Sequence, residues 1–157
     1  MKKIPVGVDD FKKLRENDFY CVDKTLFIKE LLDMRGEINV FTRPRRFGKT
    51  LNLSMLCSFF EKESARTEAG SNSGLFDGLL IMDAGEEYTK HMGQYPVIFL
   101  SLKSGTQSDF EMAYDCIIDE IIQEFRRHNA VLESDRLTED EKEQFIRLRS
   151  RKASKAE

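Results

Sequence analysis

The stretch from residue 38 to residue 50 constrains the fold of this chain more than any other part of the sequence. It begins with a short apolar, β-branched run at 38–42, continues through a loop rich in arginine, and ends in Gly48, Lys49 and Thr50. Over the residues that follow, apolar side chains recur at helical spacing. The pattern predicts a strand, a loop and a helix in direct succession.

A loop that ends in Gly-Lys-Thr between a strand and a helix is the setting of a phosphate-binding P-loop, or Walker A motif. In such a loop, backbone N–H groups surround a phosphate, and the N-terminus of the helix adds a partial positive charge. Gly48 lets the backbone approach the phosphate, Lys49 would bridge the β- and γ-phosphates, and the Thr50 hydroxyl would bind Mg²⁺. The sequence therefore predicts a nucleoside triphosphate site.

The match to the general pattern GxxxxGK[ST] is imperfect, because Arg43 stands where the first glycine is expected and Pro44 has no N–H to offer. The N–H groups that follow Pro44 are still enough for a cradle, and three arginines add charge where a triphosphate would lie. We assign the nucleotide contacts to the residues after Pro44, which are Arg45, Arg46, Phe47, Gly48, Lys49, Thr50 and Leu51.

Several further motifs occur along the first two thirds of the chain. In order, they are Ile4-Pro5-Val6-Gly7, Asp10-Phe11, Tyr20-Cys21-Val22-Asp23-Lys24-Thr25, the block from Arg43 to Thr50, Leu75-Phe76-Asp77-Gly78-Leu79 and Tyr95-Pro96-Val97-Ile98. In this order, over about residues 4–103, the chain resembles the AAA-ATPase-like family. Its members have a P-loop ATPase domain, often followed by a PD-(D/E)XK nuclease-like domain, and arginine is common among them at the position of Arg43. The resemblance implies ATP and Mg²⁺ as cofactors and an ATPase module in the complete protein.

The trio Asp23-Lys24-Thr25 allows two interpretations. As a local pattern it is a helix cap followed by a first turn. Similar proteins carry it just upstream of the P-loop, where it would lie beside the nucleotide. We therefore include Asp23, Lys24 and Arg43 as additional candidate site residues, and no chemical role follows for Lys24.

A second apolar run at 95–102 predicts another strand, with Pro96 at its beginning and 97–100 buried on both faces. Because a helix lies between the two predicted strands, the handed crossover rule favours a parallel arrangement. We expect an α/β, P-loop NTPase-like fold, with a mostly parallel sheet flanked by helices and the ligand at the carboxyl ends of the strands.

Capping residues and apolar spacing predict the helices. They are a helix through Leu14 capped by Asp9 or Asp10, one from Asp23 to Gly36, one from Thr50 to about Lys62, a short one at 84–91, a long amphipathic one from Ser108 to His128, and a charged one opened by a capping box of Thr138 and Glu141. The polar stretch 61–74 predicts a flexible loop.

Hydrolysis by a P-loop enzyme also needs an acidic strand end that holds Mg²⁺. The run at 97–100 is followed by Ser101, which is no carboxylate. Asp119 and Glu120 follow another apolar run, but helical spacing continues beyond them, so we place both on the solvated face of a helix. The catalytic residues stay unassigned, and we expect weak nucleotide binding and slow hydrolysis.

In similar proteins the acidic strand comes later than the point where this chain stops. We therefore expect the N-terminal portion of a longer protein, incomplete at the C-terminus. Residues 1–131 would form the N-terminal part of the ATPase domain, and 132–157 a charged helical tail that is partly frayed.

Composition limits the partners and the location. The net charge of -3 gives no support to general nucleic-acid affinity. The cysteines include no CxxC pair, which favours reduced thiols over disulfides or zinc. No stretch reaches the roughly 18 consecutive apolar residues of a membrane span. We expect a cytoplasmic protein.

Two other functions fit the same loop. One is a non-catalytic interaction module that retains the P-loop shape and pairs with a missing C-terminal region or another copy. The other is a nucleic-acid-associated module that uses Arg43, Arg45, Arg46 and Lys49, with Phe47 as the interleaved aromatic residue. Heat on addition of ATP and Mg²⁺ would argue against the first, and a steep salt dependence would favour the second.

Overall fold

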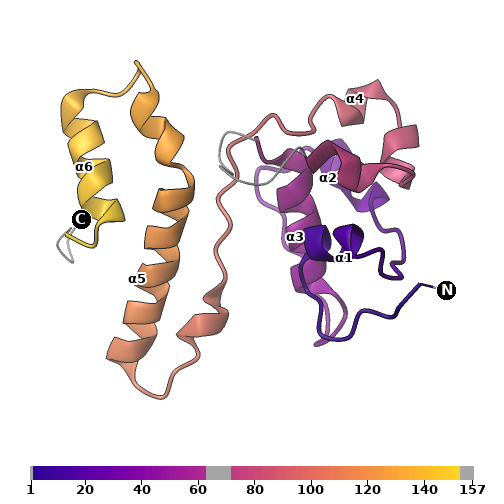
Figure 1. The fold of residues 1–157 in the computed structure, drawn as a ribbon, viewed down its shortest axis with the longest axis horizontal. Helices are drawn as coiled ribbons and strands as arrows, with labels where there is room; N and C mark the ends of the chain where they lie inside the picture. The colour runs from indigo at the N-terminus through magenta and orange to yellow at the C-terminus, as the bar shows by residue number, and fades with distance from the viewer. Residues whose placement is uncertain (1, 63–71, 153–157) are drawn as a thin grey trace. The chain divides into compact units, whose positions relative to one another are not determined.

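The computed structural model describes residues 2–62 and 72–152 (Figure 1). By its internal contacts the chain divides into two compact units, whose described parts are 2–62 with 72–97, and 98–152. The predicted division at residue 131 concerned domains of a longer protein and stays a prediction. Of the predicted loop at 61–74 and the predicted frayed end, residues 63–71 and 153–157 lie outside the described part.

The described chain is helical. The first unit contains the α-helices α1 (Phe11–Glu16), α2 (Leu26–Met34), α3 (Lys49–Phe60) and α4 (Glu86–Thr89), with the 3-10 helices η2 (Asn72–Phe76) and η3 (Leu80–Asp83). The second contains the α-helices α5 (Phe110–Arg127) and α6 (Glu139–Arg149), with the 3-10 helices η4 (Leu102–Gly105) and η5 (Asn129–Glu133).

The core of the first unit forms where α1, α3 and η2 meet. The Phe76 ring lies 5.1 Å from the Phe11 ring and 5.2 Å from the Phe59 ring, measured between centroids, and all three side chains are buried. Tilted and edge-on aromatic contacts of this kind add to the free energy gained by burying the rings. The other buried members of this cluster are Ile28, Met55, Leu75, Leu79 and Ile81.

The N-termini of the first two helices follow the local pattern only in part. Asp10 caps α1 as predicted, because its carboxylate accepts a hydrogen bond from the Lys13 N–H at 2.7 Å. Thr25, and not Asp23, stands at the cap position of α2, and it makes no side-chain capping bond there. That helix ends at Arg35, which adopts the left-handed conformation (φ +48°), one residue before the predicted end at Gly36.

The predicted α/β fold is wrong, because residues 2–62 and 72–152 contain no strand and no sheet. The first predicted strand is solvent-exposed, with Ile38 at 86% and Val40 at 81% of full exposure. The second predicted strand contributes one isolated parallel bridge, between Glu61 and Tyr95. An apolar run becomes a strand only where a neighbouring strand takes up its N–H and C=O groups, and neither run has such a neighbour in the described chain.

The segment after this bridge lies against α5 instead of a neighbouring strand. The Phe99 N–H donates to the Glu124 carboxylate at 3.1 Å, and the Ser104 hydroxyl donates to Glu120 at 3.3 Å. The Glu124 carboxylate thus satisfies a backbone N–H that a neighbouring strand would otherwise have satisfied. Ile98, one residue earlier, is 72% exposed, so this run is not buried on both faces as predicted.

The second unit is a pair of helices, α5 and α6, packed together. Asp109 caps α5 in place of the predicted Ser108, accepting from the Met112 N–H at 3.1 Å. The rings of Phe125 and Phe145 meet edge-on at 5.0 Å between the two helices. Arg151 reaches back from beyond α6 to two carboxylates of α5. The contacts anchor a helix whose sequence alone offers little apolar surface.

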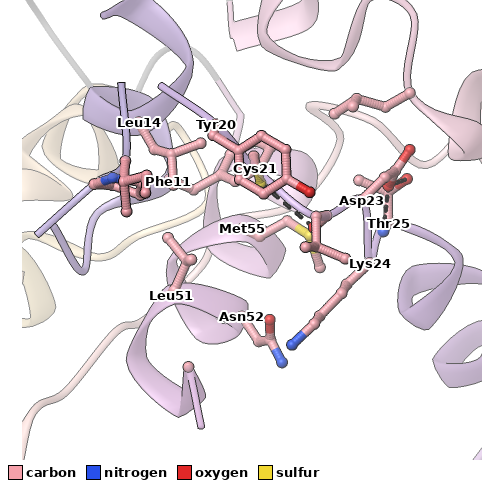
Figure 2. Close-up of a pocket in the computed structure, with 15 residues that line it drawn as sticks. Phe11, Leu14, Tyr20, Cys21, Asp23, Lys24, Thr25, Leu51, Asn52 and Met55 are labelled. Atoms are coloured by element: carbon pink, nitrogen blue, oxygen red, sulfur yellow. Dashed lines mark hydrogen bonds between the residues drawn. The ribbon is translucent and has the colours of Figure 1, made fainter. Parts of the chain in front are cut away.

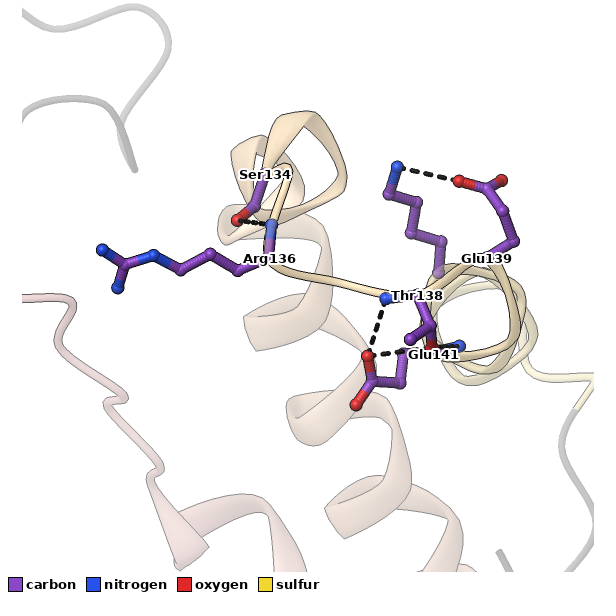
Figure 3. Close-up of polar contacts among 6 residues, drawn as sticks. Ser134, Arg136, Thr138, Glu139 and Glu141 are labelled. Atoms are coloured by element: carbon purple, nitrogen blue, oxygen red, sulfur yellow. Dashed lines mark hydrogen bonds and ion pairs between the residues drawn. The ribbon is translucent and has the colours of Figure 1, made fainter.

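The capping box at the start of α6 is present as predicted (Figure 3). The Thr138 N–H and hydroxyl donate to the Glu141 carboxylate at 2.8 and 3.0 Å, and the Glu141 N–H donates back to the Thr138 hydroxyl at 3.3 Å. Within the described residues, no helix combines the length and the hydropathy needed to cross a membrane.

Candidate functional site

The loop before α3 passes twice through left-handed backbone. The φ angle is +68° at Arg46 and +74° at Gly48, and Phe47 lies between them without a positive φ. A Cβ atom at Gly48 would meet nothing within 4 Å, so the backbone angle and not the available space requires glycine there. An alternation of positive and negative φ turns successive N–H groups toward one side, which creates a concavity for an anion.

The backbone donors of this loop have no protein acceptor. None of the N–H groups from Arg45 to Leu51 donates a hydrogen bond to another residue of the described chain. The first helical hydrogen bond comes one residue later, where the Asn52 N–H donates to the Gly48 carbonyl at 2.9 Å. The beginning of α3 also lacks a side-chain cap. A run of unsatisfied donors at a helix N-terminus is suited to an anionic ligand.

The Lys49 side chain folds back across the same loop. Its Nζ atom donates to the Arg43 carbonyl oxygen at 2.7 Å, so the first helical residue is tied to the first residue of the motif. The ammonium therefore lies over the loop and does not extend away from it. Arg43, flagged as a departure from the general pattern, contributes here through its carbonyl group.

The arginine side chains of the loop carry charge without partners. Arg43, Arg45 and Arg46 are exposed, and none of their guanidinium groups forms an ion pair or a hydrogen bond with a residue of the described chain. Phe47 is also exposed, at 61%. The loop thus presents positive charge to solvent beside the N-terminus of α3.

A pocket of about 260 Å³ adjoins this loop (Figure 2). Gly48, Leu51 and Asn52, from the start of α3, line one side of it. The N-terminal part of the chain lines the other side with Ile4, Pro5, Tyr20, Cys21, Val22, Asp23, Lys24 and Thr25. The volume lies just below the range of about 300–1,000 Å³ that is common for small-molecule sites. It suits one part of a ligand, such as a base with its sugar.

Asp23 and Thr25 form a latch between the start of α2 and η3. One Asp23 carboxylate oxygen accepts from the Thr25 N–H at 2.8 Å and from its hydroxyl at 2.7 Å, and the other accepts from the Leu80 N–H at 2.8 Å. The Thr25 hydroxyl in turn accepts from the Ile81 N–H at 3.1 Å. The side chains of Asp23 and Thr25 therefore both stabilise the fold by joining α2 to η3.

The latch keeps Asp23 ionised. Partial burial raises the pKa of this carboxyl group, but the hydrogen bonds from Leu80 and Thr25 outweigh burial and hold the pKa below its ordinary value. Because both oxygens already accept hydrogen bonds, Asp23 is poorly placed to bind a metal ion. The neighbouring Cys21 thiol has a pKa raised by burial, so it is a neutral wall of the pocket at neutral pH.

Lys24 behaves differently from its two neighbours. Its side chain is exposed, lines the pocket, and has no hydrogen-bond or ion-pair partner in the described chain. Figure 2 shows it extending away from the latch and toward Asn52 on α3. In the trio Asp23-Lys24-Thr25, the first and last residues therefore have structural roles, and the Lys24 ammonium between them has no partner in the described chain.

The fit to Mg²⁺ is partial. Thr50 is half-buried in the first turn of α3, among the residues whose backbone N–H groups have no acceptor in the described chain. Among the described residues, no group of three or more His, Cys, Asp or Glu side chains is close enough together to hold a metal ion. A single hydroxyl suits a Mg²⁺ ion that brings phosphate oxygens and water as its other ligands.

Sequence reasoning missed part of the pocket. Ile4, Pro5 and Tyr20 lie inside motifs that carry the family resemblance, but no local pattern marked them as pocket residues. Asn52 could have been inferred, since it lies four residues after Gly48 and so shares its face of the helix. The structure brings Asp23 and Lys24 to the same pocket as Gly48 and Leu51. The other predicted site residues do not line it; they are Arg43, Arg45, Arg46, Phe47, Lys49 and Thr50.

Comparisons with known proteins identify the family of this chain. A family model described as "Predicted AAA-ATPase" matches residues 5–157. An uncharacterised protein from the vnfD 5' region of Azotobacter chroococcum mcd 1 is 37% identical over 109 residues, which is 69% of this chain and 18% of that protein. The chain thus spans under a fifth of the length of this relative. No solved structure matches. Since the family is described as an ATPase, ATP binding is its general theme, and the chain belongs to this family of predicted AAA-ATPases.

Proposed function

We propose that this chain binds ATP with Mg²⁺, and that the loop from Arg45 to Leu51 holds the β- and γ-phosphates. The observation that carries the proposal is the run of backbone N–H groups at the beginning of α3 that find no acceptor among the described residues. Lys49 supports it, because its ammonium already lies over the same loop. The general ATPase theme of the family is consistent with both.

Binding would change the partner of Lys49. Its ammonium now donates to a neutral carbonyl, that of Arg43, at 2.7 Å. A phosphate oxygen in the loop would offer a charged acceptor, and hydrogen bonds between charged partners are about twice as strong as neutral ones. The amides from Arg45 to Leu51 and the partial charge of the α3 N-terminus would add to the attraction.

Thr50 would hold the metal ion together with the phosphates. When bound, Mg²⁺ would neutralise part of the phosphate charge. In our proposal the residues present bind and orient the nucleotide, and ATPase turnover belongs to the complete protein. The described residues offer Thr50 to the ion but no carboxylate cluster, which supports binding over efficient hydrolysis by this chain.

Titration calorimetry with ATP and Mg²⁺ tests this function. Wild type should release or absorb heat on binding, and Lys49→Ala should weaken the affinity by about 10- to 100-fold, the value of one charge-assisted hydrogen bond. Lys90→Ala is a matched control, because Lys90 is exposed in the same unit and its side chain has no partner in the described chain.

Each competing function predicts a different outcome. Absence of heat with wild type would favour the interaction module, and equal affinities of wild type and Lys49→Ala would exclude the loop as the site. Displacement of ATP by a nucleic acid, with an affinity that falls steeply with salt, would favour the nucleic-acid module.

A further inference from the structure

Lys24 is the member of the trio Asp23-Lys24-Thr25 that the fold does not use. Asp23 accepts three hydrogen bonds, and Thr25 is 1% exposed and bonded to both Asp23 and Ile81. The Lys24 ammonium has no partner in the described chain, although it lines a pocket with a largely apolar wall. An exposed lysine held by two fixed neighbours has a restricted reach.

Resting on the proposed function, we propose that Lys24 binds the α-phosphate of the nucleotide and that the latch of Asp23 and Thr25 positions it. The proposal adds a second cation to the site, on the side opposite the phosphate loop. It also gives the pocket an occupant, which is the base and sugar of the same nucleotide.

The pocket walls set the order of the ligand groups. Gly48 belongs both to the phosphate loop and to the pocket, so a ligand can pass from one to the other without leaving α3. With the β- and γ-phosphates in the loop, the base would lie against Ile4, Pro5 and Tyr20. The α-phosphate, which joins these parts, must then cross the first turns of α3.

Lys24 and Asn52 stand at that crossing. Asn52 is four residues after Gly48 and faces the pocket from α3, and Figure 2 shows the Lys24 side chain extending toward it from the other wall. The side-chain amide of Asn52, like the Lys24 ammonium, has no hydrogen-bond partner in the described chain. A phosphate between them would accept from both.

The nearest carboxylate does not compete for this role. Both Asp23 oxygens accept hydrogen bonds within the latch, one from Thr25 and the other from the Leu80 N–H. Figure 2 shows the Lys24 side chain extending away from the Asp23 carboxylate. Lys24 therefore keeps its charge available for a ligand. Substitution of Asp23 or Thr25 would leave the Lys24 charge in place, but it would remove the hydrogen bonds that fix the backbone on either side of Lys24.

The test compares ATP, ADP, AMP and adenosine, each titrated in competition with a fluorescent ATP analogue. Lys24→Met should weaken ATP, ADP and AMP to a similar degree, by about tenfold, because all three carry the α-phosphate. Adenosine should bind Lys24→Met and wild type equally. Lys49→Met should weaken ATP and ADP but leave AMP almost unchanged, and Lys90→Met should change nothing.

The outcomes separate the two proposals. Wild-type affinity of Lys24→Met for ATP, with weakened binding by Lys49→Met, overturns the role of Lys24 and leaves the proposed function intact. The α-phosphate assignment is overturned if Lys24→Met weakens the affinity for adenosine as much as the affinity for ATP. It is also overturned if wild type binds AMP no more tightly than adenosine. Absence of nucleotide binding by wild type overturns both proposals. Thermal unfolding of Lys24→Met should match wild type, because the side chain is exposed and has no partner among residues 2–62 and 72–152.

Discussion

The Nζ atom of Lys49 lies 2.7 Å from the carbonyl oxygen of Arg43, so the side chain that opens α3 closes the loop onto its own first residue. This contact holds the ammonium over a set of amides that have no acceptor within the part of the chain that the structure describes. The loop therefore has its positive groups in place before any ligand arrives. Such preorganisation reduces the entropy that ligand binding must cost.

Gly48 and Gly78 make a matched pair for testing the loop backbone. Both have positive φ, +74° and +71°, and a Cβ atom at either would meet nothing within 4 Å. Alanine should cost each position about 1–2 kcal/mol of stability, since left-handed backbone disfavours an L side chain. Only Gly48→Ala should also weaken ATP binding, measured by calorimetry at a temperature where both variants are folded. Equal ATP affinities for the two variants would separate the glycine from the site.

Asp23→Ala should lower the free energy of unfolding by about 1–3 kcal/mol near neutral pH, because three backbone and side-chain donors lose a charged acceptor. The folded-state pKa of Asp23 lies below its ordinary value of about 4. Its stabilisation is therefore complete above pH 4 and is lost as the pH falls through the folded-state pKa. The stability difference between wild type and Asp23→Ala should shrink in urea titrations at decreasing pH.

Asp83→Ala is the control for that series, since Asp83 is exposed at the end of η3 and its side chain has no partner in the described chain. A difference between wild type and Asp23→Ala that stays constant down to pH 2 would contradict the role of the latch.

Ile38→Ser and Ile98→Ser test the absence of a sheet. These side chains are 86% and 72% exposed, so each substitution should change stability by less than about 0.5 kcal/mol. Phe76→Ala, at a fully buried position between two other rings, should cost about 3–5 kcal/mol. Urea unfolding checks all three. A loss at Ile38 or Ile98 comparable to that at Phe76 would mean that these runs are buried in solution.

Asp119→Ala tests whether this carboxylate assists hydrolysis. Asp119 is exposed on α5 and binds the Arg151 guanidinium at 2.9 Å, together with Asp115. We expect slow ATP turnover by wild type and the same rate for Asp119→Ala, measured as phosphate release. Fast turnover that falls with this substitution would assign Asp119 a part in binding Mg²⁺.

The helix caps at Asp10 and Thr138 could be predicted from the sequence, because their hydrogen bonds join neighbours in the chain. The predicted caps at Asp23 and Ser108 were wrong, since Thr25 and Asp109 take those positions. Asp10 with Lys13, and Thr138 with Glu141, are separated by only three residues. Long amphipathic spacing likewise predicted α5, which places Asp119 and Glu120 on a helix as expected. In these cases local preference and the final structure agree.

The absence of a sheet could not be predicted from local sequence patterns. The runs at 38–42 and 95–102 have strand composition, but a strand also needs a partner, and a partner is a property of the whole fold. The N–H of Phe99 finds its acceptor in Glu124, far along the chain on α5. The sequence of the run at 95–102 does not predict this contact with Glu124.

The candidate site likewise has one part that the sequence predicts and one part that it does not. The loop around Gly48 and Lys49 is contiguous, so its residues could be named from the motif. The pocket is assembled from separate segments, with Pro5 and Lys24 on one side and Asn52 on the other. The role of Asp23 depends on Leu80, which approaches only through the packing of η3 against the start of α2.

The most direct test of the central claim follows the backbone amides themselves. At 18.3 kDa the chain is small enough for amide-resolved nuclear magnetic resonance, with ATP and Mg²⁺ added stepwise. The largest shifts should fall on the amides from Arg45 to Leu51, and Lys49→Ala should require far more ATP to reach them. Unchanged amides in this loop, or largest shifts confined to the second unit, would contradict the account.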